Sequence, residues 1–381
     1  MGAPGKMKDG KNGPPGHPFA RRVESLRGSM AKEGIGAFVL FCLEGRNWEN
    51  VFYLTGFRGS HSAFLVNPER AVIVTDGRYM RQAVSQTRVE IVEQGPEGLL
   101  KTVSSLLSQW GTRKAELENS RVPYALALSL FESARIEWAD GSSRIENMRR
   151  VKDQVESDLI AEAGRISGIA LEQTLPLIRP GITEREIAAR LEYAVRMNGA
   201  EGGWGDHEFI VASGLRSSLP HGTPTNKVIA EGEWVTIDYG SRLGGYLCDV
   251  TRNVAVGSVP GSAHRIHRLL EEAQEEAFKS VRPGAKSRDI DRAARDVIEG
   301  AGFGEAFNHG LGHGLGLELH EKPRVSRYSD DILEAGNVIT IEPGIYLEGF
   351  GGFRVEDDCL VTDEGAMWLT KTVPSGLLQA G

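Results

Sequence analysis

Apolar and polar positions follow different patterns in the front and back halves of the chain. In the front half, apolar residues at helical spacing predict helices over residues 20–33, 79–86 and 99–110, and apolar runs predict strands over 37–41, 63–66 and 71–74. The residues that join the last two strands have the composition of a turn. The front half therefore predicts a small α/β domain.

The pattern changes near residue 149, where a long helical stretch begins that reaches residue 178. We expect a domain boundary there, with one domain over residues 19–148 and a second over residues 149–381. Residues 1–18 contain five glycines, four prolines and no apolar run. We therefore expect this tail to be disordered.

The second domain contains a faint internal repeat. Arg179-Pro-Gly181 recurs as Arg282-Pro-Gly284, 103 residues later (282 − 179). In each copy this tripeptide ends one predicted helix and precedes another. Thr183 to Glu186 fits a capping box for the first copy, and Ser287 is expected to cap the helix of the second. The repeat predicts two similar helix pairs.

Strand-like runs of the second domain carry acids where apolar residues are expected. Residues 233–240 and 245–252 flank a turn and predict an antiparallel hairpin, with Asp238 in one strand and Asp249 in the other. Cross-strand neighbours on one face of a hairpin lie about 4.5–5.5 Å apart. The two carboxylates are therefore expected to lie close together.

Two later runs, 338–344 and 353–361, also predict strands, and they carry Glu342 and Glu356. Arg354 precedes Glu356 by two residues, which places both side chains on the same face of a strand.

The segment 308–316 is too rich in glycine for a stable helix and suits a close approach of the backbone to a ligand. Its histidines, His309 and His313, are expected to face inward.

Each of these features has an ordinary structural explanation when it is taken alone, since an acid in a strand usually faces solvent and a glycine-rich loop is usually a turn. Together, however, two aspartates and two glutamates balance the charge of two divalent cations, and the neutral imidazole of His313 adds a nitrogen ligand. The pattern predicts a site for two metal ions, with Asp238, Asp249, His313, Glu342 and Glu356 as the candidate ligands.

Further motifs accompany these segments in a fixed order: Tyr53-Leu-Thr-Gly-Phe57, Thr75-Asp-Gly-Arg-Tyr79, Ile210-Val-Ala-Ser-Gly214 and Leu219-Pro-His-Gly222. In this order the sequence resembles the pita-bread metallopeptidases, and within them the branch of Xaa-Pro aminopeptidases and prolidases, from about Phe19 to Thr372. The resemblance implies an α+β fold. An N-terminal creatinase-like α/β domain would precede a pita-bread catalytic domain, whose curved antiparallel sheet is covered by helices.

The resemblance also implies roles for individual residues. Asp249 and Glu356 would bridge the two ions, and Glu342 would act in catalysis as well as bind metal. The substrate-facing residues would be His221, His309, His320 and Arg354.

The implied activity is hydrolysis of the bond between an N-terminal residue and a following proline, in dipeptides or in longer peptides. An oxygen-rich ligand set with one imidazole favours Mn²⁺, with Co²⁺ or Zn²⁺ as alternatives. Two other functions stay open, a non-peptidase hydrolase of the creatinase type and a catalytically silent peptide-binding protein. The resemblance further implies a homodimer.

Composition narrows the partners and the compartment. The net charge of −8 provides no general attraction to nucleic acid or to an anionic membrane. No apolar run approaches the roughly 20 residues of a membrane-spanning helix. The three cysteines, Cys42, Cys248 and Cys359, lack CxxC spacing and are expected to be buried thiols, which indicates the cytoplasm.

The remaining histidines are less informative. His17, His264 and His267 are expected on solvated surfaces. For His61 and His207 the sequence leaves both a structural and a functional role open.

Overall fold

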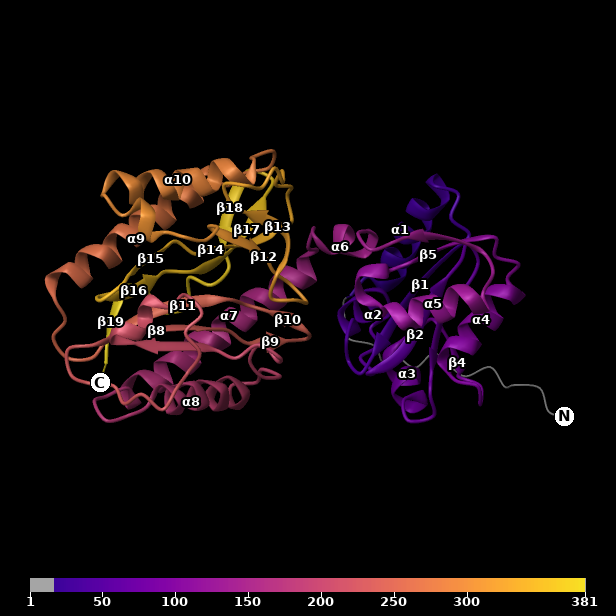
Figure 1. Ribbon diagram of the computed structural model, residues 1–381, viewed down its shortest axis with the longest axis horizontal. Coiled ribbons are helices and arrows are strands. Elements are labelled where there is room, and N and C mark those ends of the chain that lie inside the picture. The colour runs from indigo at the N-terminus through magenta and orange to yellow at the C-terminus, as the bar shows by residue number, and fades with distance from the viewer. Residues whose placement is uncertain (1–16, 381) are drawn as a thin grey trace. The chain divides into compact units, whose positions relative to one another are not determined.

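The structure is a computed structural model that describes residues 17–380, and the first sixteen residues of the predicted disordered tail lie outside this range. The chain divides between Arg149 and Arg150 into two compact units, which we call unit 1 and unit 2 (Figure 1). Within the described range, no helix combines the length and the apolar character needed to cross a bilayer.

Unit 1 is built around a mixed sheet of six strands in the order β4-β3-β2-β1-β5-β6. The three strands β1, β2 and β3 pair antiparallel, and the outer pairs are parallel. Its elements are α1 (Phe19–Lys32), β1 (Ala37–Leu43), α2 (Trp48–Thr55), β2 (His61–Val66), β3 (Ala71–Thr75), α3 (Met80–Gln86), β4 (Glu90–Glu93), α4 (Leu99–Gln109), β5 (Lys114–Leu117), α5 (Tyr124–Ser133), β6 (Glu137–Asp140) and α6 (Arg144–Arg149). The predicted helices and strands of the front half are confirmed to within two residues at each end. The α/β character is confirmed as well.

Unit 2 contains two main sheets. One has the strand order β19-β11-β8-β7 and the other β13-β12-β14-β17-β18. The elements are α7 (Gln154–Thr174), α8 (Glu184–Met197), β7 (Ile210–Ser213), β8 (Trp234–Tyr239), β9 (Arg242–Leu243), β10 (Tyr246–Leu247), β11 (Val250–Ala255), α9 (Gly261–Ser280), α10 (Ser287–Gly300), β12 (Gly312–Gly314), β13 (Glu321–Val325), β14 (Val338–Ile341), β15 (Gly344–Leu347), β16 (Gly351–Arg354), β17 (Asp357–Thr362), β18 (Gly365–Trp368) and β19 (Leu377–Gln379).

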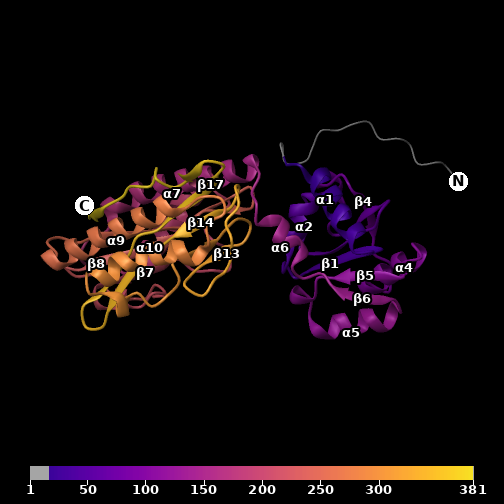
Figure 2. The same ribbon diagram turned by 90° about the horizontal axis from the view of Figure 1, so that it is seen from above.

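Each sheet of unit 2 is covered by one helix pair. Apolar residues of α7 and α8 share a core with β7, β8 and β11, and those of α9 and α10 share a core with β14 and β17. Figure 2 shows α9 and α10 side by side. The predicted curved, helix-covered architecture is confirmed.

The internal repeat is confirmed by the helix bounds, because α8 and α10 begin and end at residues that are 103 apart (287 − 184 and 300 − 197). Thr183 and Glu186 form the predicted capping box. The predicted cap at Ser287 is wrong: Lys286 holds the cap position, and the Ser287 hydroxyl donates to the Asp331 carbonyl at 3.0 Å.

Two further expectations are corrected. The stretch 353–361 is two strands, because β16 ends at Arg354 and β17 begins at Asp357, and Glu356 lies in the break. His267 is 3% exposed, and its ring packs edge-on against Phe353, so it is a core residue. An amphipathic helix with mixed polar residues gave no sign that this position faces inward.

Unit 1 buries the carboxyl group of Glu118 behind two asparagine amides. Glu118 is fully buried and accepts hydrogen bonds from the amides of Asn47 at 2.6 Å and Asn50 at 2.5 Å. Burial raises the pKa of Glu118 to about 7, although the Asn47 hydrogen bond opposes the shift.

We expect this carboxyl to make folding less favourable as the pH rises from 4.5 to about 7, because in this window Glu118 binds its proton in the folded state and loses it in the unfolded state. Glu118→Gln cannot titrate. Relative to that variant, the parent should lose roughly 3 kcal/mol of unfolding free energy between pH 4.5 and about 7. Outside this window the difference between the two proteins should stay constant.

Urea unfolding of the full chain at a series of pH values measures the difference. The exposed Glu132→Gln serves as the control and should follow the parent. A difference between the parent and Glu118→Gln that stays constant from pH 4 to pH 8 would contradict the assignment.

Candidate metal centre

The five predicted metal ligands come from both sheets of unit 2. Asp238 lies in β8, Asp249 directly before β11, and His313 in the centre of β12. Glu342 follows β14, and Glu356 lies between β16 and β17. The predicted hairpin is present, but Asp238 pairs with Thr251, so Asp249 lies two residues along the opposite strand.

The backbone around His313 explains why the sequence requires glycine there. A side-chain carbon on Gly312 would lie 2.1 Å from the Thr340 carbonyl oxygen, and one on Gly314 would lie 2.3 Å from the Lys322 carbonyl oxygen. Only glycine allows β12 to pass this close to its neighbours β13 and β14. His313 is therefore held at a fixed depth between two strands.

Four of the five candidates gather around one point. Ligand atoms of Asp249, His313 and Glu356 all lie within 4.8 Å of one another. His313 Nε2 lies 3.4 Å from Glu342 Oε1 and 3.7 Å from Asp249 Oδ2. Asp238 belongs to the same cluster, since its charge raises the pKa of both Asp249 and Glu342.

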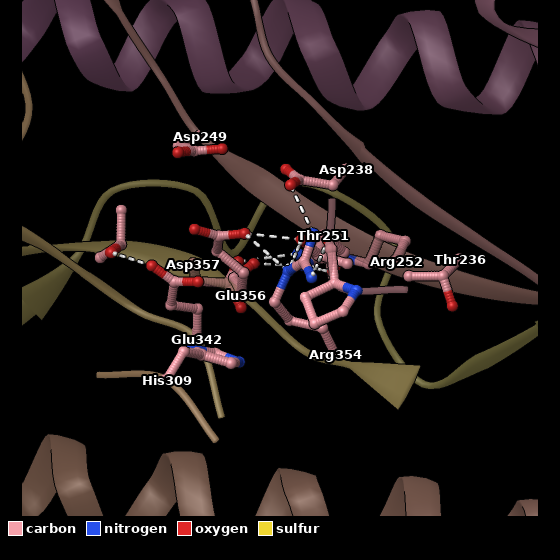
Figure 3. Close-up of polar contacts among 12 residues, drawn as sticks. Thr236, Asp238, Asp249, Thr251, Arg252, His309, Glu342, Arg354, Glu356 and Asp357 are labelled. Atoms are coloured by element: carbon pink, nitrogen blue, oxygen red, sulfur yellow. Dashed lines mark hydrogen bonds and ion pairs between the residues drawn. The ribbon is translucent and has the colours of Figure 1, made fainter. Parts of the chain in front are cut away.

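Arg354 joins Asp238 to the rest of the site (Figure 3). Its Nη2 donates to Asp238, and its Nε donates to Thr251 Oγ1 at 3.0 Å and lies 3.7 Å from Glu356 Oε2. The Thr251 hydroxyl in turn donates to Glu356 at 2.6 Å. Although β16 ends at Arg354, the predicted proximity of Arg354 and Glu356 is confirmed.

The carboxylates repel one another strongly. Burial first, and neighbouring acids second, raise the pKa of Asp249 and of Glu356 well above the usual range. Burial also raises the pKa of Glu342 to about 8. Four acids face a single guanidinium, so the protein alone does not neutralise this cluster.

The arrangement of the candidate ligand atoms fits metal ions. Burial lowers the pKa of His313 to about 3, so the ring is neutral. Its Nδ1 faces the Gly314 carbonyl, which can only accept a hydrogen bond, so Nε2 presents a lone pair to Asp249 and Glu342. Within the described residues, Oδ1 of Asp238 and Oδ1 of Asp249 are buried without a hydrogen-bond partner. Acceptors that converge in this way need cations between them.

The predicted substrate-facing histidines lie around the cluster. His320 packs edge-on against His313, with 4.3 Å between ring centroids. His309 Nε2 lies 3.1 Å from the Tyr346 hydroxyl. His221 is exposed and near enough to contribute to the lowered pKa values of His309 and His320. The adjacent Pro220 carbonyl accepts a hydrogen bond from Arg354 at 3.0 Å.

The two histidines whose roles the sequence left undecided, His207 and His61, lie in different units. His207 is exposed, and its ring lies edge-on to His320 at 6.0 Å between centroids, so it borders the site. His61 lies in unit 1, where Nε2 is 3.3 Å from Gln94 Oε1.

Sequence reasoning missed two residues of the site. Tyr346 is buried in β15, and its hydroxyl accepts a hydrogen bond from Arg354 at 2.8 Å. Arg324 stands directly opposite His313 in the β12–β13 pair, is exposed, and contributes to the lowered pKa of His313 and His320. A tyrosine in an apolar strand gave no distinctive signal, and the position of Arg324 follows from strand pairing.

Comparison with known proteins agrees with this geometry. Residues 158–363 match the metallopeptidase family M24, and residues 22–151 match the creatinase/prolidase N-terminal domain. The chain is 38% identical over 353 residues to an Xaa-Pro dipeptidase of Pyrococcus horikoshii, covering 92% of this chain and 97% of the relative.

Solved structures show the same likeness. An Xaa-Pro dipeptidase from Bacillus anthracis superimposes with a TM-score of 0.89 at 37% identity, covering 95% of this chain and 99% of that one. An X-Pro aminopeptidase from Thermotoga maritima superimposes with a TM-score of 0.88 at 36% identity, covering 94% and 100%.

We expect Asp249→Ala and Glu356→Ala to bind fewer divalent ions than the parent, because each removes a carboxylate from the centre of the cluster. Elemental analysis of the purified protein after dialysis against excess Mn²⁺ measures the bound metal. Asp330→Ala, whose carboxylate is 79% exposed, is the control. Parental metal content in both ligand variants would contradict the assignment.

Proposed function

The chain belongs to the metallopeptidase family M24, and from this premise we propose that it is a metal-dependent exopeptidase that hydrolyses the bond between an N-terminal residue and a following proline. The observation that carries the proposal is the convergence of acidic oxygens and the His313 nitrogen, since ligand atoms of Asp249, His313 and Glu356 all lie within 4.8 Å of one another. A non-peptidase hydrolase and a silent binding protein are less favoured, since the similar proteins named above are Xaa-Pro peptidases.

The proposed ligands are Asp238, Asp249, His313, Glu342 and Glu356, with Asp249 and Glu356 shared between two ions. We propose Mn²⁺ because four of the five ligands are carboxylates, with Co²⁺ and Zn²⁺ as alternatives. Two bound divalent ions would supply charge stabilisation and activate water for attack on the peptide carbonyl.

The side chains around the ligands supply the proton transfers. Glu342, oriented by the Thr340 hydroxyl at 3.2 Å, takes the proton of the attacking water and passes it to the proline nitrogen as the C–N bond breaks. This transfer is needed because an amide nitrogen must gain a proton to leave as an amine.

His320 is better placed than His309 to donate to the developing oxyanion. The His309 Nδ1 faces the Gly310 carbonyl at 2.7 Å, so its Nε2 accepts from the Tyr346 hydroxyl. His320 is exposed and makes ring contacts with His207 and His313, so a ring nitrogen remains for the substrate. His221 is exposed and lies near both His309 and His320.

Arg354 orients groups within the site. Its guanidinium is 3% exposed and donates to Asp238, Thr251, Tyr346 and the Pro220 carbonyl. Little of it remains for a substrate. Arg324 has no side-chain partner in the described chain, and we assign it to the free carboxylate that follows proline in a dipeptide.

We also propose a cytoplasmic homodimer. The cytoplasm fits the three cysteines, which are all buried free thiols. The dimer rests on the family resemblance, and sedimentation of the purified chain measures it.

We expect the Mn²⁺-loaded protein to release alanine from Ala-Pro and from Ala-Pro-Ala, and to leave Ala-Ala intact. Free alanine is measured by chromatography. A chelator should stop the reaction, and readded Mn²⁺ should restore it. Cleavage that resists the chelator, or equal cleavage of Ala-Ala, would refute the proposed function.

Arg324→Ala should weaken dipeptide hydrolysis selectively. The expected loss is about ten- to a hundredfold in kcat/KM for Ala-Pro, mainly through KM, because a charge-assisted hydrogen bond contributes roughly 1.5–3 kcal/mol. A longer Ala-Pro peptide, whose chain continues beyond proline, should be affected less. The exposed Arg327→Ala is the matched control. An equal loss for both substrates would contradict the assignment to the carboxylate.

A further inference from the structure

The two sheets of unit 2 meet at the metal centre through very little backbone pairing. Within the first sheet, β8 and β11 pair over six residues. Between the two sheets, Thr251 forms an isolated bridge with Glu356, and the Glu356 amide donates to the Thr251 carbonyl at 3.4 Å. This long hydrogen bond connects the strand that follows Asp249 to Glu356 itself.

Buried side chains add further connections between the β8–β11 strands and the segment around Glu356. Three of them, Arg252, Asn253 and Asp358, are called the seam. Arg252 Nη1 donates to the Glu356 carbonyl at 2.7 Å and to the Thr251 carbonyl at 2.9 Å. Asn253 donates to the Arg354 carbonyl at 2.7 Å. Asp358 Oδ2 accepts from the Asp249 amide at 3.0 Å. The seam residues are at most 2% exposed.

Arg252 is itself held firmly in place (Figure 3). Its Nη2 donates to Asp357 Oδ1 at 2.7 Å, and its Nε donates to the Pro374 carbonyl at 2.6 Å. Lys371 holds the other oxygen of Asp357 at 2.8 Å. A planar guanidinium with partners on several sides fixes direction as well as distance, which an ammonium group cannot do.

Arg252 and Asp358 hold backbone groups of Glu356 and Asp249, the two proposed bridging ligands. Asn253 holds the carbonyl of Arg354, two residues before Glu356. We propose that Arg252, Asn253 and Asp358 are positioning residues that set the spacing of these two carboxylates and thereby the affinity for the metal pair. Partners of this kind, one step behind the ligands, typically contribute 10–100-fold to metal affinity. The inference rests on the proposed metal centre and is independent of the peptide that is cleaved.

Arg252→Lys tests the seam because it keeps the positive charge opposite Asp357 and loses the planar guanidinium with its several donors. The metal-free full chain is titrated with Mn²⁺, free Mn²⁺ is followed by electron paramagnetic resonance, and urea unfolding is measured alongside. We expect about 10–100-fold weaker Mn²⁺ binding. Arg144→Lys likewise keeps a charge but loses a two-pronged contact, with the buried Glu116 of unit 1, and should lose stability with parental Mn²⁺ binding.

Asp358 provides the second variant pair. Asp358→Asn keeps an oxygen for the Asp249 amide and removes the charge, so it should bind Mn²⁺ nearly as the parent does, whereas Asp358→Ala should bind it at least tenfold more weakly. Equal weakening in both variants would mean that charge, not position, matters, and would overturn the proposal. Parental binding in Arg252→Lys would overturn it as well. A parent chain that takes up no Mn²⁺ would overturn the metal centre itself.

Discussion

Mutual repulsion among buried carboxylates is the constraint on which unit 2 depends. Asp238, Asp249, Glu342 and Glu356 are held together where water cannot screen them, and Arg354 contacts two of them, Asp238 and Glu356. Charges in such a place are costly unless they are paired. The folded backbone must therefore keep the acids together until metal ions bind, and the glycines around His313 and the contacts of Arg354 serve that requirement.

The internal repeat explains why the site lies where the two sheets meet. Asp238 and Asp249 come from the first repeat, and Glu342 and Glu356 occur 104 and 107 residues later (342 − 238 and 356 − 249) in the second. Each repeat thus contributes one carboxylate at the end of a central strand, in β8 or directly after β14, and one directly before the neighbouring strand, β11 or β17. Neither half would hold two ions by itself, so the geometry depends on how the halves are joined.

Residues that depend on local pattern could be predicted from the sequence. The capping box at Thr183, the hairpin that carries Asp238 and the glycine-rich segment around His313 are all set by neighbours along the chain. The order of the motifs carried the family resemblance, and the resemblance predicted the fold. The predicted helix cap at Ser287 and the predicted surface position of His267 were wrong. The partners of these side chains, the Asp331 carbonyl and Phe353, are distant in sequence. The strand break at Glu356 likewise results from pairing with Thr251 across the sheets.

Three arginines near the site differ in burial, and each makes a different kind of contact. Arg252 is 2% exposed and donates mainly to backbone carbonyls, so it fixes the path of the chain. Arg354 is 3% exposed and donates to Asp238 and to the groups around it, so it orients a ligand. Arg324 is exposed and lacks a side-chain partner in the described chain, so its charge is available to an anion from solvent. The number of donors already used in the folded protein, rather than proximity to the metal ligands, decides which arginine can recognise a substrate.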